Sequence, residues 1–214
     1  MKEIILAGAG GHALCVIDSI LSQGVYRIVG ITEAEEYTRK TILGFDIIGD
    51  DSFLEKYYQS GVKYAFVTVG SVGDTSVRER LFIKLKKIGF LLPAVIDKSA
   101  NVSGYADLSE GVYIGRNASV NAGTEIKAMA IINTGAIVEH SCRIGEFAHI
   151  SPGAVLCGDV TIGKHTHIGA NATVKNGIVI GDYSLIGAQS NVVDPLQDHI
   201  IAYGNPCRRV GYHG

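Results

Sequence analysis

The sequence has few cysteines and no excess of positive charge, and both features restrict the kind of protein it can be. Four cysteines are spread over 214 residues without a CxxC pair, which argues against a disulfide framework or a cysteine-based zinc site. We expect reduced thiols, packed as small apolar side chains, at Cys15, Cys142, Cys157 and Cys207. The net charge of -2 provides no broad positive field for a phosphodiester backbone, so nucleic-acid binding is not expected.

Long apolar runs are also missing. The first residues, MKEIILAGAG, become glycine-rich after a short apolar stretch and lack the sustained apolar region of a signal peptide. No apolar run approaches membrane-spanning length. We therefore expect a cytoplasmic protein without a membrane span, and the apolar fraction of 47% is ample for a core.

Residues 1–94 alternate short apolar segments with amphipathic stretches, the pattern of βαβ units around a parallel sheet. This pattern predicts strands at 4–7, 27–31 and 64–69 and helices at 12–22 and 74–88, with Gly89 as the stop of the second helix. About ninety residues provide only one mononucleotide-sized half of a dinucleotide fold. We predict a Rossmann-like half domain over residues 1–94.

The period changes after Leu92. Every sixth position from Ile96 to Val192 is aliphatic, and glycine follows the aliphatic residue directly at 115, 145, 163, 169, 181 and 187. One large inward side chain per six residues suits a prism of short parallel strands, each flat face being followed by a corner. Three faces make a coil of eighteen residues, so residues eighteen apart stack on neighbouring coils. The pattern resembles the left-handed parallel β-helix of the hexapeptide-repeat acyltransferases, which we predict for residues 95–214.

His140 lies two residues after the inward Val138, so it faces out of the predicted prism. Eighteen residues further on is Gly158, which places a backbone N–H without a side chain beside the imidazole. A base and an amide donor are the minimum equipment for acyl transfer. The alternative from periodicity alone is an unremarkable solvent-facing histidine.

A second group of histidines lies further along the prism. His149 and His167 are eighteen residues apart and should stack, with His165 close by. The γ-class carbonic anhydrases hold zinc with histidines between β-helices, but the spacing of His165 and His167 does not resemble their ligand spacing. We therefore expect no metal site here.

The segment GAGGHA at 8–13 follows a strand and precedes a helix, and Glu33 lies at the end of the next strand, where a dinucleotide fold places its ribose-binding acid. With only half of such a fold, the glycines more plausibly admit one diphosphate at the helix N-terminus. A glycine turn that merely permits tight packing is the alternative. Arg78 either meets a phosphate near this pocket or is an exposed helical arginine.

Three segments resemble the bacterial nucleotide-sugar N-acetyltransferases, which acetylate 4-amino-sugars: GAGGH at 8–12, INTGAIVEHSCRIGEFAHISPGAVLCGDVTIG at 132–163, and GNPCRR at 204–209. The resemblance covers essentially the whole chain. It implies a homotrimer that uses acetyl-CoA and a nucleotide-linked amino-sugar without a metal.

The resemblance also assigns residues. It implies that His140 is the general base and that the amide of Gly158 holds the oxyanion. Contacts to acetyl-CoA are implied for His149, Ala170, Ala188 and Arg208. The nucleotide-sugar is implied to lie against Gly10, Gly11, His12, Thr32, Glu33 and Gly70.

One position departs from the family, which commonly has Glu or Asp directly after the catalytic histidine, where this chain has Ser141. In an extended segment the side chain of Glu139 points to the other face, so the sequence leaves open whether a carboxylate assists the imidazole. An unassisted imidazole suits an amine acceptor better than a hydroxyl. The rivals are O-acetylation of sialic acid or its CMP form, a non-catalytic sugar-nucleotide-binding protein, and a metal hydratase or hydrolase.

Overall fold

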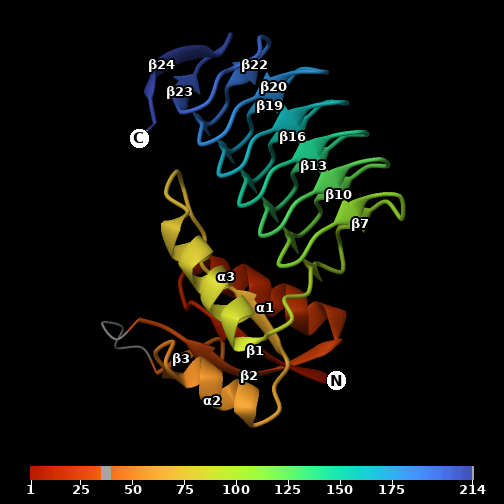
Figure 1. The fold of residues 1–214 in the computed structure, drawn as a ribbon. Helices are drawn as coiled ribbons and strands as arrows, with labels where there is room; N and C mark the ends of the chain where they lie inside the picture. The colour runs from red at the N-terminus through yellow and green to blue at the C-terminus, as the bar shows by residue number, and fades with distance from the viewer. Residues whose placement is uncertain (35–39, 214) are drawn as a thin grey trace.

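In the computed structural model, which describes residues 1–34 and 40–213, an α/β unit leans against one side of a long prism of short strands (Figure 1). The α/β unit contains β1 (Lys2–Ala7), α1 (Gly11–Gln23), β2 (Tyr26–Thr32), β3 (Thr41–Ile42), β4 (Phe45–Gly49), α2 (Phe53–Gln59), β5 (Tyr64–Val67) and α3 (Ser76–Ile88). Its sheet order is β3-β4-β2-β1-β5, and β2, β1 and β5 run parallel.

The α/β unit confirms the predicted strands and both predicted helices, with small shifts at their ends. The strand predicted at 64–69 ends at Val67, and the helix predicted at 74–88 begins at Ser76 and ends before Gly89, whose φ of 109° closes it. The sequence prediction missed α2 and the β3–β4 hairpin, because these segments are too short to show a clear period.

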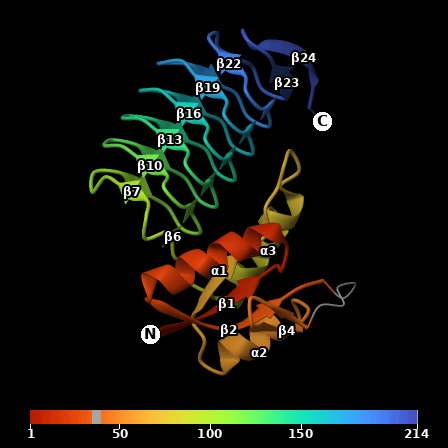
Figure 2. The ribbon, with the colours of Figure 1, turned by 180° about the vertical axis from the view of Figure 1, so that it is seen from behind.

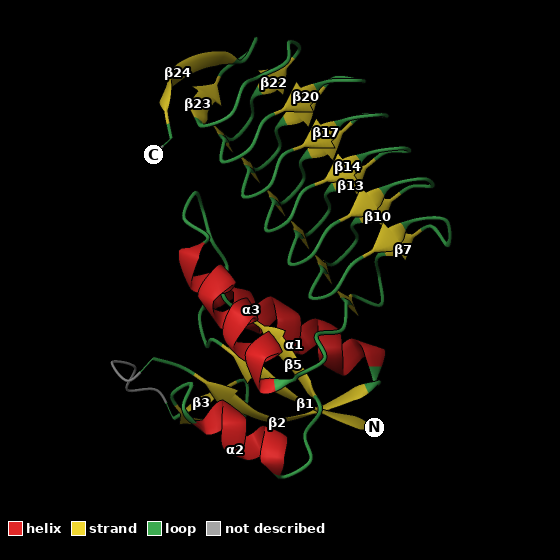
Figure 3. Ribbon diagram, in the orientation of Figure 1, coloured by secondary structure: helices red, strands yellow, loops and turns green. Residues whose placement is uncertain are grey.

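From β6 to β22 each strand holds two residues, and these short strands stack in regular rows along the prism (Figure 3). The first residue of each strand faces out and the second faces the prism core. These strands are β6 (Val95–Ile96), β7 (Asn101–Val102), β8 (Asp107–Leu108), β9 (Tyr113–Ile114), β10 (Ser119–Val120), β11 (Glu125–Ile126), β12 (Ile131–Ile132), β13 (Ile137–Val138), β14 (Arg143–Ile144), β15 (His149–Ile150), β16 (Val155–Leu156), β17 (Thr161–Ile162), β18 (His167–Ile168), β19 (Thr173–Val174), β20 (Val179–Ile180), β21 (Leu185–Ile186) and β22 (Asn191–Val192). The hexad prediction is confirmed at every strand. Each aliphatic side chain buried in this way contributes about 1.5–3 kcal/mol.

The prism is a left-handed parallel β-helix with three faces. One face, called the docking face here because the α/β unit packs on it, contains β6, β9, β12, β15, β18 and β21. It is completed by β23 (Ile200–Tyr203) and β24 (Arg208–Tyr212). The second face runs from β7 to β22, and the third from β8 to β20. Strands pair with the strand eighteen residues on, as in Ile137 with Val155, so the predicted coil length is confirmed.

The α/β unit packs on the docking face, with β6 beside α1 (Figure 2). Outward residues Val95, Tyr113 and Ile131 share a hydrophobic core with α1 and the sheet. Helix α3 covers the adjacent corner, where Met129 and Phe147 join a second core. The loops that follow β1 and β5 therefore lie against the β-helix.

Two further sequence expectations can be compared with the structure. All four cysteines are free; Cys142 and Cys207 are buried and Cys157 is half-buried, but Cys15 is exposed on α1, so its expected burial was wrong. The longest helices, α1 and α3, have 13 residues each, and no helix in the described ranges has the length and apolarity needed to cross a membrane.

Candidate active site

The residues expected to hold a nucleotide meet at one edge of the α/β sheet. Strands β1, β2 and β5 end side by side, and their carboxyl ends lead directly into the segments that carry these residues. β1 lies between β2 and β5 at the point where the strand order reverses, which is where open α/β sheets bind ligands. This edge therefore brings together Gly10, Gly11, His12, Thr32, Glu33 and Gly70.

The glycine turn after β1 leaves the start of α1 open. At Gly8 a side chain would come within 2.4 Å of Val69 and the φ of 109° favours glycine, so this position is required by packing. Among the described residues, a side chain at Gly10 or Gly11 would meet nothing within 4 Å, and no side chain caps α1. Exposed N–H groups at the start of a thirteen-residue helix can hold an anionic group such as a phosphate.

Glu33 and Thr32 support this turn from β2. The Glu33 carboxylate accepts the N–H of Ala9 at 2.5 Å and that of Ala34 at 2.9 Å. Thr32 is fully buried and its hydroxyl donates to Asp51 at 2.9 Å. Glu33 therefore remains half-exposed at the loop, whereas the side chain of Thr32 supports the loop from behind.

His12 is a neutral imidazole at this edge. Its ring meets the ring of Tyr113 edge to face, with 5.0 Å between centroids, and a side chain at Gly70 would lie 3.2 Å from its Cβ. Burial, with a smaller contribution from the charge of Arg78, lowers the pKa of His12 to about 3. His12 can thus offer hydrogen bonds to a ligand but no positive charge at neutral pH.

His149 connects the β-helix to the loop after β5. Its Nδ1 lies 2.8 Å from the Ser71 carbonyl, so this nitrogen carries the proton and donates it. Its Nε2 lies 3.2 Å from Asn133 Nδ2, and the Asn133 amide is oriented by Oδ1, which accepts the N–H of Thr134 at 2.7 Å. Burial lowers the pKa of His149 to about 4. Both ring nitrogens are therefore engaged within the chain.

The predicted stacking of His149 and His167 is confirmed, with 4.9 Å between ring centroids. His167 Nε2 lies 3.1 Å from Ser151 Oγ, while its buried Nδ1 has no partner among the described residues. His165 instead contacts the Thr75 hydroxyl, with 2.5 Å between Nδ1 and Oγ1. Within residues 1–34 and 40–213, no group of three or more His, Cys, Asp or Glu side chains could hold a metal ion.

Arg78 is neither a phosphate ligand nor an exposed helical arginine. It lies on the side of α3 that faces the β-helix and is buried there. Its guanidinium donates to the carbonyls of Phe147, at 3.1 Å, and Met129. It also reaches Ser71 Oγ at 3.2 Å. Both sequence interpretations were wrong because they took no account of the β-helix packing against this helix.

The corner between the second and third faces carries His140, which is exposed and leans over Gly158 as the eighteen-residue period predicted. A methyl group at Gly158 would lie 2.6 Å from both Cε1 and Nε2 of the imidazole, so only glycine leaves room for this ring. The N–H of Gly158 has no acceptor among the described residues. A base and a free amide donor are therefore adjacent.

No carboxylate of the described residues forms a hydrogen bond with the His140 ring. Its Nδ1 lies 3.4 Å from Ser141 Oγ, and the Glu139 carboxylate lies 3.4 Å from the backbone nitrogen of His140 instead. Asn176, which sequence reasoning missed, brings its Nδ2 within 3.2 Å of the same methyl position over Gly158. Two steps of eighteen from His140 reach Asn176, so the period contained the signal.

His140 and the nucleotide edge lie on opposite sides of one chain. His140 is in the corner between the second and third faces, whereas the α/β unit covers the docking face. In a triangular prism, the corner that carries His140 is separated from the docking face by the full width of the prism. One chain alone therefore does not bring the base to its own glycine turn.

The remaining predicted residues lie on the upper coils. Ala170 and Ala188 occupy equivalent corner positions one coil apart, and the Ala170 carbonyl accepts the N–H of Gln189 at 2.8 Å. Arg208 lies at the start of β24 and pairs with Asp194 at 3.2 Å on the surface. The structure thus groups these three at one end of the β-helix, away from the glycine turn.

Comparison with known proteins identifies relatives of this chain. The family model described as the PglD N-terminal domain matches residues 3–85, and the model for bacterial transferase hexapeptide repeats matches residues 159–194. PerB from Caulobacter crescentus, solved with CoA and GDP-perosamine, is 35% identical with a TM-score of 0.92, over 99% of this chain and 98% of that chain. The chain belongs to the sugar N-acetyltransferase family. It is an acyltransferase with hexapeptide repeats.

Two further solved structures support this family. The acetyltransferase domain of PglB from Neisseria gonorrhoeae is 31% identical with a TM-score of 0.91, over 98% of this chain and 100% of that chain. WeeI from Acinetobacter baumannii, at 21% identity and a TM-score of 0.87 over 98% of this chain and 100% of that chain, shares the fold. A comparison with curated proteins gave no significant match.

Proposed function

We propose that this acetyltransferase moves the acetyl group of acetyl-CoA to the amino group of a nucleotide-linked 4-amino-4,6-dideoxy sugar. The observation that carries the proposal is the imidazole of His140 lying over Gly158, whose N–H is free among the described residues. In support, PerB was solved with CoA and GDP-perosamine, and the PglB domain with acetyl coenzyme A. Variants of the Caulobacter enzyme with a histidine replaced by asparagine or alanine bind the same pair.

The reaction is a direct transfer in one ternary complex. The sugar amine attacks the thioester carbonyl, and His140 Nε2 takes a proton from the attacking nitrogen. The Gly158 N–H stabilises the oxyanion of the tetrahedral intermediate. As the carbon–sulfur bond breaks, the imidazolium returns the proton to the sulfur of CoA, so no covalent enzyme intermediate forms.

In this proposal residues 1–94 hold the nucleotide-sugar and residues 95–214 hold acetyl-CoA. The open start of α1 at Gly10 and Gly11 binds the diphosphate, with His12, Glu33 and Gly70 nearby. Because Thr32 is buried, it acts by supporting the turn. Acetyl-CoA runs along the upper coils past His149, Ala170, Ala188 and Arg208.

The active protein is a homotrimer in this proposal. Since the prism separates His140 from the glycine turn of its own chain, the base must come from a neighbouring copy. Cyclic assembly of three prisms places the corner of one chain near the docking face of the next. We place the reaction in the cytoplasm, because the four free cysteines suit a reducing compartment.

The first experiment measures thiol release from acetyl-CoA with UDP-, dTDP- and GDP-linked 4-amino-sugars, and with CMP-sialic acid. We expect release with an amino-sugar, and His140→Ala should lower turnover by roughly 10²–10⁴ while the circular dichroism spectrum stays unchanged. Activity on sialic acid alone, or near-normal turnover of His140→Ala, would overturn the proposal.

A complementation experiment tests the shared site. Gly10→Asp has room for its side chain, since nothing lies within 4 Å, but brings a negative charge to the diphosphate position. Each variant alone should have strongly reduced turnover, whereas trimers formed by co-expressing Gly10→Asp and His140→Ala should regain a measurable part of the wild-type activity. No recovery in verified mixed trimers would mean that base and nucleotide site act within one chain.

A further inference from the structure

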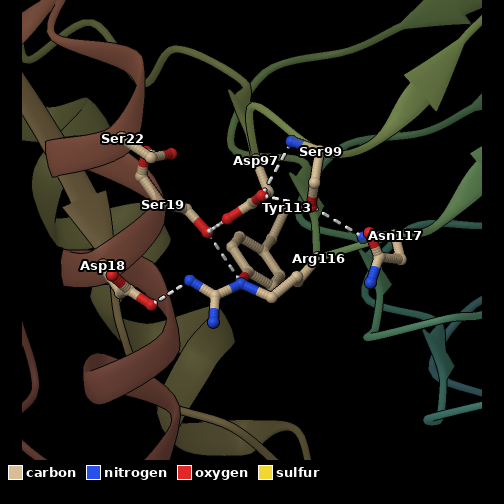
Figure 4. A network of polar contacts seen from close by, with 8 residues as sticks. All are labelled: Asp18, Ser19, Ser22, Asp97, Ser99, Tyr113, Arg116 and Asn117. Carbon is tan, nitrogen blue, oxygen red and sulfur yellow. Dashed lines mark hydrogen bonds and ion pairs between the residues drawn. The ribbon is translucent and has the colours of Figure 1, made fainter.

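A buried polar network joins α1 to the first coils of the β-helix (Figure 4). Ser19 on α1 is 1% exposed, and its Oγ donates to Asp97 Oδ2 at 2.6 Å. The hydroxyl of Tyr113, a residue that is also 1% exposed, lies 3.1 Å from the same Oγ. Because the single proton of Ser19 is directed to the carboxylate, Tyr113 must donate to Ser19.

The carboxylate at the end of this chain is itself held firmly. Asp97 is 4% exposed, and its Oδ1 accepts the N–H of Ser99 at 2.9 Å and the Ser99 hydroxyl at 2.7 Å. Ser99 Oγ in turn accepts the N–H of Asn117 at 3.0 Å, from the next coil. The chain of hydrogen bonds from Tyr113 through Ser19 thus ends at the ionised carboxylate of Asp97, which the β-helix holds in place. Hydrogen bonds to an ionised group are charge-assisted and therefore stronger than neutral ones.

The anchored ring of Tyr113 reaches the nucleotide edge. Ser19 and His12 are seven residues apart on α1, so they lie two turns apart on one face of the helix. Tyr113 spans this distance, with its hydroxyl at Ser19 and its ring against His12 at an interplanar angle of 89°. Among the described residues the His12 ring has no hydrogen bond, so its edge-to-face contact with the Tyr113 ring is the contact that can orient it.

The same row of the docking face fixes the other loop of this edge. Tyr113 and His149 both pair with Ile131, on either side of it. Tyr113 contacts His12 from the β1–α1 turn, and His149 holds the Ser71 carbonyl of the β5–α3 loop. One row of outward side chains therefore sets both loops between which a ligand would lie.

We propose that Tyr113 is a positioning residue for the nucleotide-sugar site: anchored through Ser19 to Asp97, its ring sets the orientation of His12. The inference rests on the proposed function, in which His12 contacts the bound sugar nucleotide. Among the described residues, the side chains of Ser19, Asp97 and Tyr113 have no hydrogen bond or ring contact with His140 or His149. We therefore expect the anchor to affect binding of the sugar nucleotide and not of acetyl-CoA.

Kinetics distinguish positioning from a general structural effect. Ser19→Ala and Asp97→Asn release the ring without touching His12, and each should raise KM for the sugar nucleotide about fivefold, the effect of one lost hydrogen bond. KM for acetyl-CoA and kcat should stay unchanged. Tyr113→Leu should have a larger effect, whereas Tyr105→Leu, at a position that is 86% exposed, is the matched control.

A double-mutant cycle tests whether the effect passes through His12. In a His12→Ala background, Ser19→Ala should no longer change KM for the sugar nucleotide. Equal effects in both backgrounds, or parallel changes in both KM values, would overturn the positioning role. Tyr113→Phe keeps the ring and should lie between wild type and Tyr113→Leu.

An NMR measurement on the free enzyme needs no substrate. The ring protons of His12 should be shifted by the ring current of Tyr113, and Ser19→Ala should move them toward averaged values. Unchanged His12 resonances in both Ser19→Ala and Asp97→Asn would overturn the inference even where sugar acetylation is observed. Conversely, a shift in these variants without any sugar acetylation would count against the proposed function and leave the positioning contact intact.

Discussion

Histidines on the docking side of the molecule and the histidine at the opposite corner occupy very different environments. His12, His149 and His167 are packed between the α/β unit and the β-helix, and burial lowers their pKa values to about 3, 4 and 4. His140 is exposed and leans over a glycine. The same side chain is thus used as a neutral hydrogen-bonding ring on one side and remains accessible to a substrate on the other.

The difference shows that the surroundings of each imidazole determine what it can do. At His149 the N–H of Asn133 points at Nε2 and the Ser71 carbonyl receives Nδ1–H, an arrangement that leaves no place for a second ring proton. At His140 the neighbouring Gly158 N–H has no acceptor among the described residues, and in the proposed mechanism it stabilises the oxyanion. A general base must both accept a proton and reach the substrate, and only the corner position offers both.

Among the variants that keep His140 itself, the largest predicted effect comes from removing the room under its imidazole, the proposed catalytic base. Gly158→Ala would place a methyl group 2.6 Å from Nε2 of His140, so the ring must rotate away from the oxyanion position. We expect turnover to fall about 10–100-fold, because misplacement of a catalytic group by about 1 Å is enough for such a loss. Steady-state assays with acetyl-CoA and the amino-sugar substrate measure it.

Gly104→Ala is the matched control for this substitution. Gly104 lies three coils earlier at the same corner, and a side chain there would meet nothing within 4 Å. Its activity and thermal stability should equal those of wild type. Equal activity of Gly158→Ala and Gly104→Ala would show that the leaning imidazole does not matter for catalysis.

The second prediction concerns the protonation state of His149, which lies on the docking face. Asn133→Asp replaces the N–H that faces His149 Nε2 with a carboxylate oxygen, which favours the protonated ring. The pKa of His149 should rise by about 2 units from its value of about 4. An NMR titration of the ring carbons measures the shift.

Asn171→Asp serves as the comparison for that titration, because it adds the same charge at an exposed corner. It should leave the His149 titration where it is. If Asn133→Asp also leaves it unchanged, burial alone keeps His149 neutral and the hydrogen bond from Asn133 has no part in it.

Contacts within the β-helix could be predicted by counting, because each coil is encoded locally. The inward aliphatic positions, the strand register and the stacking of His140 over Gly158 all follow from a period of eighteen. Asn176 was accessible to the same arithmetic. A repeat whose coils touch only their neighbours makes long-range contacts as predictable as local ones.

Contacts between the two units could not be predicted in this way. Arg78 donates to carbonyls of the β-helix, and His149 is held by Ser71 from the α/β unit. These contacts depend on how one unit docks on the other, which no local pattern encodes. The consequence was a wrong interpretation of Arg78. Tyr113 and Asn133 also went unnoticed, although they contact His12 and His149.

The smallest predicted effect concerns His167, whose buried Nδ1 has no partner among the described residues. Burial lowers its folded-state pKa from 6.5 to about 4, so between these pH values the unfolded chain binds a proton that the folded chain does not. The free energy of unfolding should therefore fall as the pH drops from 7 to 5, by on the order of 1–2 kcal/mol for this group.

His167→Phe removes this titration while keeping a ring against His149. At pH 7 the variant should be within about 1 kcal/mol of wild type, because the lost contact with Ser151 is offset by removal of an unpaired buried nitrogen. At pH 5 it should be the more stable protein. Urea unfolding at both pH values and one protein concentration measures this difference, and an identical pH dependence in the two proteins would mean that His167 is not held neutral by the fold.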